Sequence, residues 1–276
     1  MSNLIIANIA IVSLIAVAAA AVLYFVAQKF KVAQNVRAEE IEQILPQANC
    51  GACGKAGCHA FAEACAAADA EAFAGLYCTV GGSKVMSIIA EKLGYALAER
   101  APTAAVLRCN GTCEKAPSKV EYIGLKSCRL ASRVFVGQTG CPNGCLRLGD
   151  CVRNCPFGAL SIDQNTGLPK VDADKCTSCG KCVKICPRGL FEIRLRGKAE
   201  VFVACRNTQK GAQARKNCSA ACIGCMKCSK ICPQIKVENN LSYIPDSLDA
   251  AQFGAELAQN CPTGAIIFRS ENNEQN

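Results

Sequence analysis

The fold of this chain is indicated most clearly by the stretch Cys176-Thr-Ser-Cys179-Gly-Lys-Cys182-Val-Lys-Ile-Cys186-Pro187. Its cysteines follow the pattern C-x2-C-x2-C-x3-C-P, in which three closely spaced thiolates on a tight loop face one four-iron, four-sulfur (4Fe-4S) cluster. The fourth thiolate, marked by the proline, stands apart and reaches a neighbouring cluster. The chain has 23 cysteines among 276 residues, many of them in similar strings. The sequence therefore predicts a protein that carries several iron-sulfur clusters.

Disulfides and structural zinc are the alternative uses of so many cysteines. Disulfide-rich chains are usually short and secreted, whereas this chain has an odd number of cysteines and no cleavable export signal. Structural zinc sites typically use two Cys-x-x-Cys pairs held well apart in sequence, rather than a triplet followed by Cys-Pro. The spacing therefore favours iron-sulfur clusters over both alternatives.

An internal repeat occupies the chain from residue 141 onward. Four copies of Cys-Pro, each followed by a short β-branched or aromatic stretch, begin at Cys155, Cys186, Cys232 and Cys261. Four half-modules of loop, turn and strand predict two ferredoxin-like pairs. The predicted fold class is α+β, with a single N-terminal transmembrane helix, a small helical 4Fe-4S module and then ferredoxin-like iron-sulfur modules of the βαββαβ type.

The ligand sets of these modules follow from the exchange of the fourth cysteine between half-modules. The first pair is predicted to hold one cluster on Cys141, Cys145, Cys151 and Cys186, and another on Cys176, Cys179, Cys182 and Cys155. The second pair is degenerate, because residues 246–260 contain no cysteine. Its one predicted cluster is held by Cys222, Cys225, Cys228 and Cys261, which leaves Cys232 without a cluster.

A separate cysteine module precedes the repeat. Its predicted ligands are Cys50, Cys53, Cys58 and Cys78, with glycines between the thiolates that let backbone amides approach the sulfurs. Cys65 lies on a helix-like Ala/Glu stretch, and burial as a small hydrophobic residue is its expected role. The single histidine, His59, is expected to pack beside the module rather than to bind metal.

The cysteines outside these sets leave two interpretations open. Ala105-Val-Leu-Arg-Cys109 and Val201-Phe-Val-Ala-Cys205 are similar short strands that end in cysteine, and each is followed by a further cysteine. A fifth metal site on Cys109, Cys128, Cys205 and Cys218 is one interpretation, and buried structural thiols are the other. The predicted cofactors are thus four 4Fe-4S clusters, with a fifth under the first interpretation.

The N-terminal segment is predicted to anchor the chain in a membrane. Residues 4–27 are almost entirely apolar and, as a helix, would extend about 36 Å, enough to cross a bilayer. Lys29, Lys31 and Arg37 follow the segment, and no basic residue precedes it. The positive-inside rule then predicts a single-pass protein of the cytoplasmic (inner) membrane, with its C-terminal iron-sulfur portion in the cytoplasm. A buried core helix is the alternative.

The chain is predicted to divide into six segments. They are a transmembrane anchor (1–28), a linker helix (29–45), a 4Fe-4S module (46–82), a connector (83–130), a two-cluster ferredoxin-like domain (131–200) and a second, degenerate ferredoxin-like domain with one cluster (201–276). The connector begins with an amphipathic helix over residues 82–100.

The net charge does not indicate a nucleic-acid-binding protein. The formal charge is +9. Each oxidised 4Fe-4S cluster with four thiolates carries about −2, so four clusters reduce the total to roughly +1. With no tryptophan, only 5% aromatic residues and no nucleic-acid motif, binding to RNA or DNA is not expected.

The sequence resembles one known family over nearly its whole length. The resemblance is carried by the stretch Leu45-Pro-Gln-Ala-Asn-Cys-Gly-Ala-Cys-Gly-Lys-Ala-Gly-Cys58, by Cys78 with its Gly-Gly, and by residues 144–159 with their stretched cysteine spacing. On these motifs the chain is similar to the B subunit of the Rnf complex, an ion-translocating ferredoxin:NAD oxidoreductase, in its longer form. Long forms commonly carry a second complete ferredoxin pair, and this chain lacks the last triplet.

The resemblance implies an electron-transfer subunit of a redox-driven ion translocase. It implies soluble reduced ferredoxin as the electron donor and the other Rnf subunits in the membrane as acceptors. Within this chain, one apolar helix without an ionisable side chain cannot relay ions, and no G-x-G-x-x-G fingerprint for a nucleotide is present. Electron transfer is therefore the only chemistry expected of it, and no catalytic residue is assigned.

Two other functions remain open at the level of sequence. A Cys-x2-Cys-x4-Cys module like that of Cys50 to Cys78 also occurs in iron-sulfur anchors of corrinoid or carbon-monoxide-processing systems. A membrane-tethered zinc scaffold is the non-redox alternative.

Overall fold

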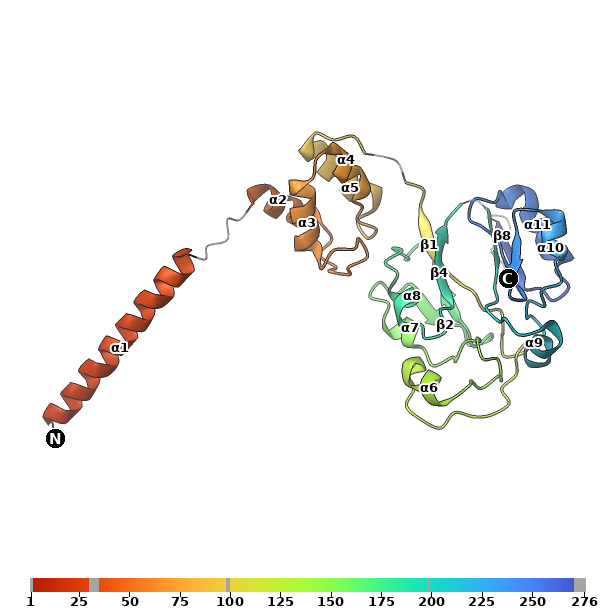
Figure 1. The fold of residues 1–276 in the computed structure, drawn as a ribbon, viewed down its shortest axis with the longest axis horizontal. Helices are drawn as coiled ribbons and strands as arrows, with labels where there is room; N and C mark the ends of the chain where they lie inside the picture. The colour runs from red at the N-terminus through yellow and green to blue at the C-terminus, as the bar shows by residue number, and fades with distance from the viewer. Residues whose placement is uncertain (1, 30–34, 98–99, 198, 271–276) are drawn as a thin grey trace.

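A computed structural model describes residues 2–29, 35–97, 100–197 and 199–270. Figure 1 shows a long N-terminal helix, a small helical module and a larger part that contains the strands. This order agrees with the predicted fold class.

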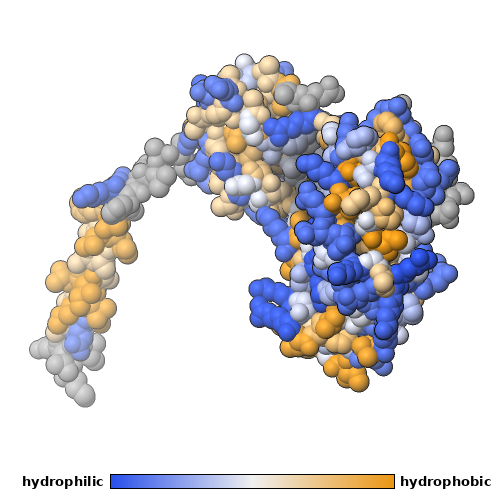
Figure 2. All heavy atoms as spheres, turned by 45° about the vertical axis from the view of Figure 1, so that its right-hand side comes forward, coloured by the Kyte–Doolittle hydropathy of each residue, from blue (hydrophilic) through white to orange (hydrophobic). Residues whose placement is uncertain are grey.

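Helix α1 (Ser2–Lys29) has the length and composition of a membrane span. Its apolar stretch Ile6–Val26 is 21 residues long, and none of it is buried within the chain. At about 1.5 Å per residue it extends roughly 32 Å, close to the thickness of a bilayer core. A helix that is apolar on every side must be buried in a protein or in lipid. Figure 2 shows this apolar surface standing apart from the rest of the chain.

The helical module consists of α2 (Val36–Ile44), α3 (Cys58–Ala67), α4 (Ala70–Gly75) and α5 (Gly82–Leu93). The side chains of Asn35 and Asp69 accept hydrogen bonds from the first turns of α2 and α4, and Gly94 ends α5 in the left-handed conformation. These caps satisfy backbone groups that the helix ends leave unpaired.

The core of this module contains residues from three segments that were predicted to be separate. Ile41 of α2, Phe61 of α3, and Met86 and Ile89 of α5 are each at most 1% exposed and belong to one apolar cluster. Helix α2 of the predicted linker and helix α5 at the start of the predicted connector are therefore components of the module, and residues 30–34 of that linker lie outside the described residues. The module is larger than predicted because the apolar faces of α2 and α5 must be buried, and the segment between them, which contains α3 and α4, supplies the apolar side chains that bury them.

The first strand-containing half has the βαββαβ order. It comprises β1 (Thr103–Leu107), α7 (Asp150–Arg153), β2 (Leu160–Ile162), β3 (Pro169–Val171), α8 (Lys181–Ile185) and β4 (Phe191–Leu195). Strand β1 pairs antiparallel with β4, so that Thr103 faces Leu195 and Leu107 faces Phe191, and β2 and β3 form a hairpin. This half thus begins near residue 103 rather than at 131, because β4 finds its partner strand inside the predicted connector.

The second half repeats that order. It comprises β5 (Ala199–Val203), α9 (Gly211–Asn217), α10 (Lys227–Ile231), β6 (Lys236–Glu238), β7 (Leu241–Tyr243), α11 (Ala250–Asn260) and β8 (Ile266–Ser270). Strands β5 and β8 pair antiparallel, as do β6 and β7. The cysteine-free stretch forms α11, an 11-residue helix at the position that the five-residue α8 holds in the first half.

The two halves pack against each other through β1 and β5. Val106, Phe202 and Ala204 are buried in one cluster with Ile267. The loops after the two strands are also joined, since the backbone N–H of Asn110 donates to the carbonyl of Ala204 at 2.9 Å.

Helix α6 (Cys128–Val134) lies in the long loop of the first half and contributes two side chains to an exposed apolar surface. This surface, visible at the lower end of the molecule in Figure 2, is formed by six large apolar side chains, which are Val120, Ile123, Leu125, Leu130, Val134 and Val136.

Candidate iron-sulfur centres

Five cavities in the described part of the chain are each lined by at least four cysteines. They enclose about 320 to 430 Å³ each, including space open to solvent. This is roughly ten times the ~30 Å³ that one water molecule occupies in the liquid. All 23 cysteines are free thiols, which contradicts the disulfide alternative.

The N-terminal cavity is lined by the four cysteines predicted for the first module, which are Cys50, Cys53, Cys58 and Cys78. Asn49 positions this loop, because its side-chain oxygen accepts the backbone N–H of Cys58 at 2.8 Å. Gly81 donates its N–H to the sulfur of Cys78 at 3.4 Å.

Of two side chains beside the N-terminal cavity, Cys65 is buried as expected, whereas the side chain of His59 is 62% exposed. Cys65 is 0% exposed within the apolar core, and burial raises the pKa of its thiol to about 12. His59 lies outside the cavity, with Nδ1 at 2.6 Å from Oε2 of Glu42, and this hydrogen bond raises the imidazole pKa. His59 therefore links α3 to α2.

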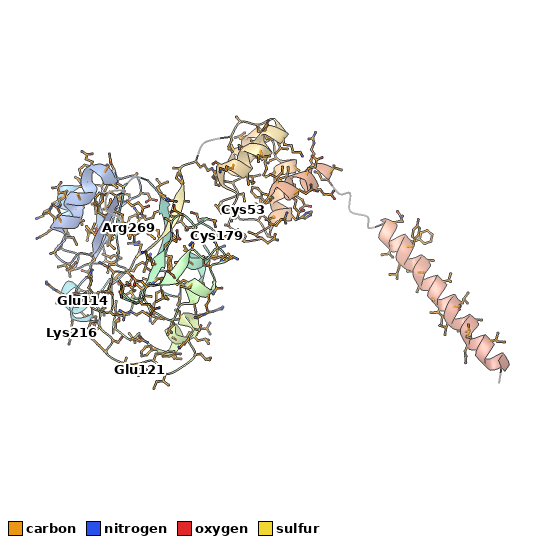
Figure 3. The ribbon with its side chains drawn as sticks, turned by 180° about the vertical axis from the view of Figure 1, so that it is seen from behind. Cys53, Glu114, Glu121, Cys179, Lys216 and Arg269 are labelled. Atoms are coloured by element: carbon orange, nitrogen blue, oxygen red, sulfur yellow. The ribbon has the colours of Figure 1, made fainter. Side chains whose placement is uncertain are left out.

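The first paired cavity lies between β1, β2 and α8. Its cysteines are the predicted set Cys155, Cys176, Cys179 and Cys182. The backbone N–H of Ala105, on β1, donates to the sulfur of Cys176 at 3.4 Å. Cys53 and Cys179, labelled in Figure 3, mark the N-terminal cavity and this one.

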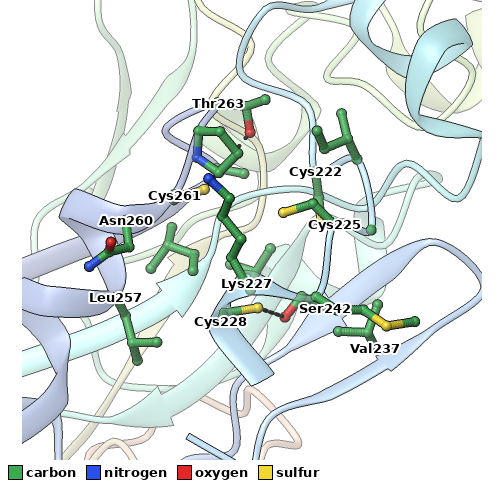
Figure 4. Close-up of a pocket in the computed structure, with 17 residues that line it drawn as sticks. Cys222, Cys225, Lys227, Cys228, Val237, Ser242, Leu257, Asn260, Cys261 and Thr263 are labelled. Atoms are coloured by element: carbon green, nitrogen blue, oxygen red, sulfur yellow. Dashed lines mark hydrogen bonds between the residues drawn. The ribbon is translucent and has the colours of Figure 1, made fainter. Parts of the chain in front are cut away.

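The C-terminal cavity contains the predicted set Cys222, Cys225, Cys228 and Cys261. Figure 4 labels these cysteines around the cavity and shows the Lys227 side chain extending across it. The side chain of Cys228 lies 3.1 Å from the hydroxyl of Ser242 on β7.

The second paired cavity differs from the prediction at one position. It is lined by Cys145, Cys151 and Cys186, as expected, but its fourth cysteine is Cys128 in place of Cys141. Cys128 is the first residue of α6, and burial, followed by the neighbouring thiols of Cys128 and Cys186, raises the pKa of Cys151. The long loop brings α6 back onto α7, which the spacing of the cysteines does not reveal.

The junction cavity lies between the two halves. It is lined by Cys109, Cys205 and Cys218, three members of the fifth site considered from the sequence, together with Cys141 and Cys145. Cys128, the remaining member of that site, is absent from its lining and lines the second paired cavity instead. Cys128 and Cys141 have thus exchanged places relative to the sequence-based sets.

Three cysteines line none of the five cavities. Cys65 and Cys232 are buried in apolar clusters, whereas Cys113 is exposed. Cys232 follows α10. A cluster on Cys232 would require a further cysteine triplet, and the place of that triplet is taken by α11, which packs against α10.

The chemistry of the cavities suits anionic clusters with thiolate ligands. Burial raises the pKa of Cys182 to about 11 and that of Cys151 to about 12, so these thiols need a bound cation to lose their protons. Backbone N–H groups point at the sulfurs, as from Leu190 to Cys186 and from Arg147 to Cys145, each at 3.4 Å. Such hydrogen bonds stabilise negative charge on a ligand sulfur.

The arrangement fits a cluster of several irons better than a single ion. Two thiolates on one tetrahedral zinc lie about 3.8 Å apart, given a Zn–S distance of about 2.3 Å. Within the described residues, no three Cys, His, Asp or Glu side chains converge closely enough to bind one ion. The cysteines instead surround a space, which favours iron-sulfur clusters over the zinc alternative.

Comparisons with known protein families agree with this chemistry. A profile described as a putative Fe-S cluster matches residues 45–72. A 4Fe-4S dicluster domain matches residues 138–190, and a 4Fe-4S single cluster domain matches residues 170–217. The chain therefore contains 4Fe-4S domains.

Individual relatives match far more of the chain. The B subunit of the proton-translocating ferredoxin:NAD(+) oxidoreductase complex of Clostridium ljungdahlii is 40% identical over 266 residues, which cover 96% of this chain and 92% of the relative. The chain belongs to this B-subunit family. Another member, the B subunit of the Na(+)-translocating complex of Acetobacterium woodii, is 39% identical over 242 residues, or 87% of this chain and 71% of that protein. The B subunit of an ion-translocating oxidoreductase complex in Methanosarcina acetivorans is 37% identical over 218 residues, 79% of this chain and 81% of that relative. These relatives confirm the family expected from the sequence motifs.

Proposed function

We propose that this chain is the electron-transfer subunit of a membrane-bound, ion-translocating ferredoxin:NAD oxidoreductase. The observation that carries the proposal is the match to a B subunit of such a complex over 96% of the chain. We infer that it accepts electrons from reduced ferredoxin and relays them through its clusters to the other subunits of the complex.

The ligand sets proposed for four 4Fe-4S clusters follow the cavities. Cys50, Cys53, Cys58 and Cys78 hold the first, and the C-terminal and first paired cavities supply two more with the cysteines described above. Cys145, Cys151 and Cys186 contribute to the fourth. When bound, each cluster accepts and releases one electron.

The surrounding residues support electron transfer without proton or group transfer. The thiolates hold the irons, and basic side chains lie beside them to balance negative charge: Lys227 lines the C-terminal cavity, Lys181 the first paired cavity and Arg188 the second. Apolar side chains make up most of the remaining lining, which limits the rearrangement of water when the charge changes.

Helix α1 supports membrane attachment, and the basic residues Lys29, Lys31 and Arg37 support a cytoplasmic location for the cluster-bearing part. The exposed apolar surface around α6 supports a protein partner, since patches of this kind mark interaction sites. The relatives favour this function over the corrinoid or carbon-monoxide alternative.

Replacement of Cys179 by alanine tests the proposal in the assembled complex. We expect loss of one low-potential EPR signal and a sharp decrease in ferredoxin-dependent NAD reduction, because one relay centre loses a ligand. Cys113→Ala, at an exposed cysteine outside the cavities, is the matched control and should leave both readouts unchanged. An unchanged rate and cluster content in Cys179→Ala would contradict the proposal.

A further inference from the structure

The junction cavity contains four cysteines that the four proposed clusters do not require. Cys109 follows β1 and Cys141 lies in the long loop of the first half, whereas Cys205 follows β5 and Cys218 follows α9 in the second half. Each half thus contributes two sulfurs to one space of about 410 Å³.

Cys145 lines both the junction cavity and the second paired cavity, so the sulfurs must be divided between them. Assigning Cys145 to the second paired cavity leaves four cysteines in each, the number that a 4Fe-4S cluster needs. If Cys145 were assigned to the junction cavity instead, that cavity would have five cysteines and the second paired cavity would have three.

A buried carboxylate fixes Cys128 beside the second paired cavity. Asp150, at the start of α7, accepts hydrogen bonds from the hydroxyl of Ser127 at 3.1 Å and from the backbone N–H of Arg129 at 3.0 Å. These two residues flank Cys128, and Asp150 itself precedes Cys151. The carboxylate therefore ties the beginning of α6, with its cysteine, to the helix that carries Cys151.

Hydrogen bonds between the halves and within the loop build the junction cavity. The Ser219 amide donates to the carbonyl of Lys115 at 2.9 Å, next to Cys218. The Arg147 guanidinium donates to the carbonyl of Gly111 at 2.8 Å, which fixes the loop after Cys109. Figure 3 shows Glu114 of this loop and Lys216 of α9 in the same region.

Glycines leave room beside the sulfurs. A Cβ atom on Gly111 would lie 3.5 Å from the sulfur of Cys218 and 3.6 Å from that of Cys109, and a Cβ on Gly144 would lie 3.4 Å from the sulfur of Cys141. The two sulfurs from opposite halves thus approach the same point at the edge of the cavity.

The polar groups at the junction suit a negatively charged occupant. Arg206 lines the cavity, as does Arg108, which is only 5% exposed and also forms an ion pair with Glu192 at 3.1 Å. The backbone N–H of Asn207 donates to the sulfur of Cys205 at 3.4 Å, as backbone groups do in the other cavities.

We propose that Cys109, Cys141, Cys205 and Cys218 hold a further 4Fe-4S cluster that joins the two halves, and that Cys128 is the fourth ligand in the second paired cavity. This inference rests on the proposed iron-sulfur function and adds a fifth centre with ligands from both ferredoxin-like halves.

The first test is the composition of the full-length chain, purified in detergent under anaerobic conditions and reconstituted with iron and sulfide. Five clusters correspond to about twenty irons and twenty acid-labile sulfides per chain, whereas four correspond to about sixteen. Spin integration of the EPR spectrum after full reduction should give five spins rather than four. About sixteen irons, or sixteen irons with one zinc, would overturn the inference.

Paired substitutions test which cysteines share a cluster. In Cys141→Ala/Cys205→Ala both changes affect one cluster, so the double variant should lose about four irons. In Cys141→Ala/Cys186→Ala the changes affect different clusters, and about eight irons should be lost. The reverse pattern would show that Cys141 belongs with Cys186 and would overturn the ligand exchange. Cys113→Ala, the control, should lose none.

Failure of the inference and failure of the proposed function give different results. A chain with about sixteen irons and intact Cys205→Ala spectra retains the relay but has no junction cluster. A chain without iron or sulfide would overturn both. The composition and the spin count of the unmodified chain do not depend on whether any variant folds.

Discussion

Arg194 is expected to stabilise the packing of the two halves more than any exposed ion pair. It lies on β4 of the first half, with only 6% of its side chain exposed. Its Nε lies 2.8 Å from Oδ1 of Asp246, and both terminal nitrogens donate to the carbonyl of Ile244 at 3.0 Å. Both partners belong to the second half.

Replacement of Arg194 by methionine keeps most of the apolar stem but removes these hydrogen bonds. Breaking a buried ion pair costs about 3 to 5 kcal/mol, because the remaining charge loses its partner. Asp246 is 37% exposed and can be partly solvated, so we expect the lower end, about 3 kcal/mol. This corresponds to a change of more than 100-fold in the unfolding equilibrium constant, at about 1.36 kcal/mol for each factor of ten.

The loss of visible iron-sulfur absorbance in guanidinium, measured anaerobically on the reconstituted full-length chain, reports the opening of the halves. We expect Arg194→Met to bleach at least tenfold faster than the unmodified chain. Arg196→Met, immediately after the same strand, is the matched control, because Arg196 pairs with Asp174 at the surface, with 39% of its side chain exposed. Such a pair contributes about 0 to 1 kcal/mol. Equal bleaching rates for the two variants would show that Arg194 does not hold the halves together.

Two further predictions concern the second half. Gly254→Ala on α11 should destabilise the second half by about 1 to 3 kcal/mol, because the added Cβ would lie 2.2 Å from the Phe268 ring and the strain exceeds the gain in helix propensity. The control is Gly75→Ala on α4, where the space is open, and it should not destabilise the helical module. Equal thermal stability of the two variants would contradict this prediction. Burial raises the pKa of Glu200 above its ordinary 4.5 despite the nearby Arg269, so the charged form opposes folding. Glu200→Gln should therefore be more stable than the unmodified chain at pH 7. The difference in stability should shrink as the pH falls through the raised pKa and should be absent below 4.5. Guanidinium bleaching assays measure this difference, and one that grows on acidification would disprove the prediction.

Features set by local spacing could be predicted from the sequence. The triplet that begins at Cys176 and the one that begins at Cys222 each lie on a short loop, so neighbouring residues alone bring their sulfurs together. The apolar span of α1 and the repeat of two ferredoxin-like halves were visible for the same reason, because both depend on composition or regular spacing.

Features set by contacts between distant segments could not be predicted in full. The strand β1 was recognised before Cys109, but its partner β4 is more than 80 residues away, and the sequence offered no sign of that pairing. Cys128 and Cys141 lie in one long loop without a regular pattern, so spacing could not decide which of them reaches Cys186. The signal that could have placed Cys128 is Asp150, a carboxylate suited to bind the beginning of a helix.

The positions of the cysteines along the chain have a consequence for biosynthesis. The sulfurs of the N-terminal cavity all leave the ribosome between residues 50 and 78, whereas those of the junction cavity span residues 109 to 218. Since domains generally fold from the N-terminus during synthesis, the helical module can be matured on a nascent chain that has not yet completed its second half. With the ligand set proposed for the junction, iron and sulfide can be delivered there only after Cys218 has been synthesised.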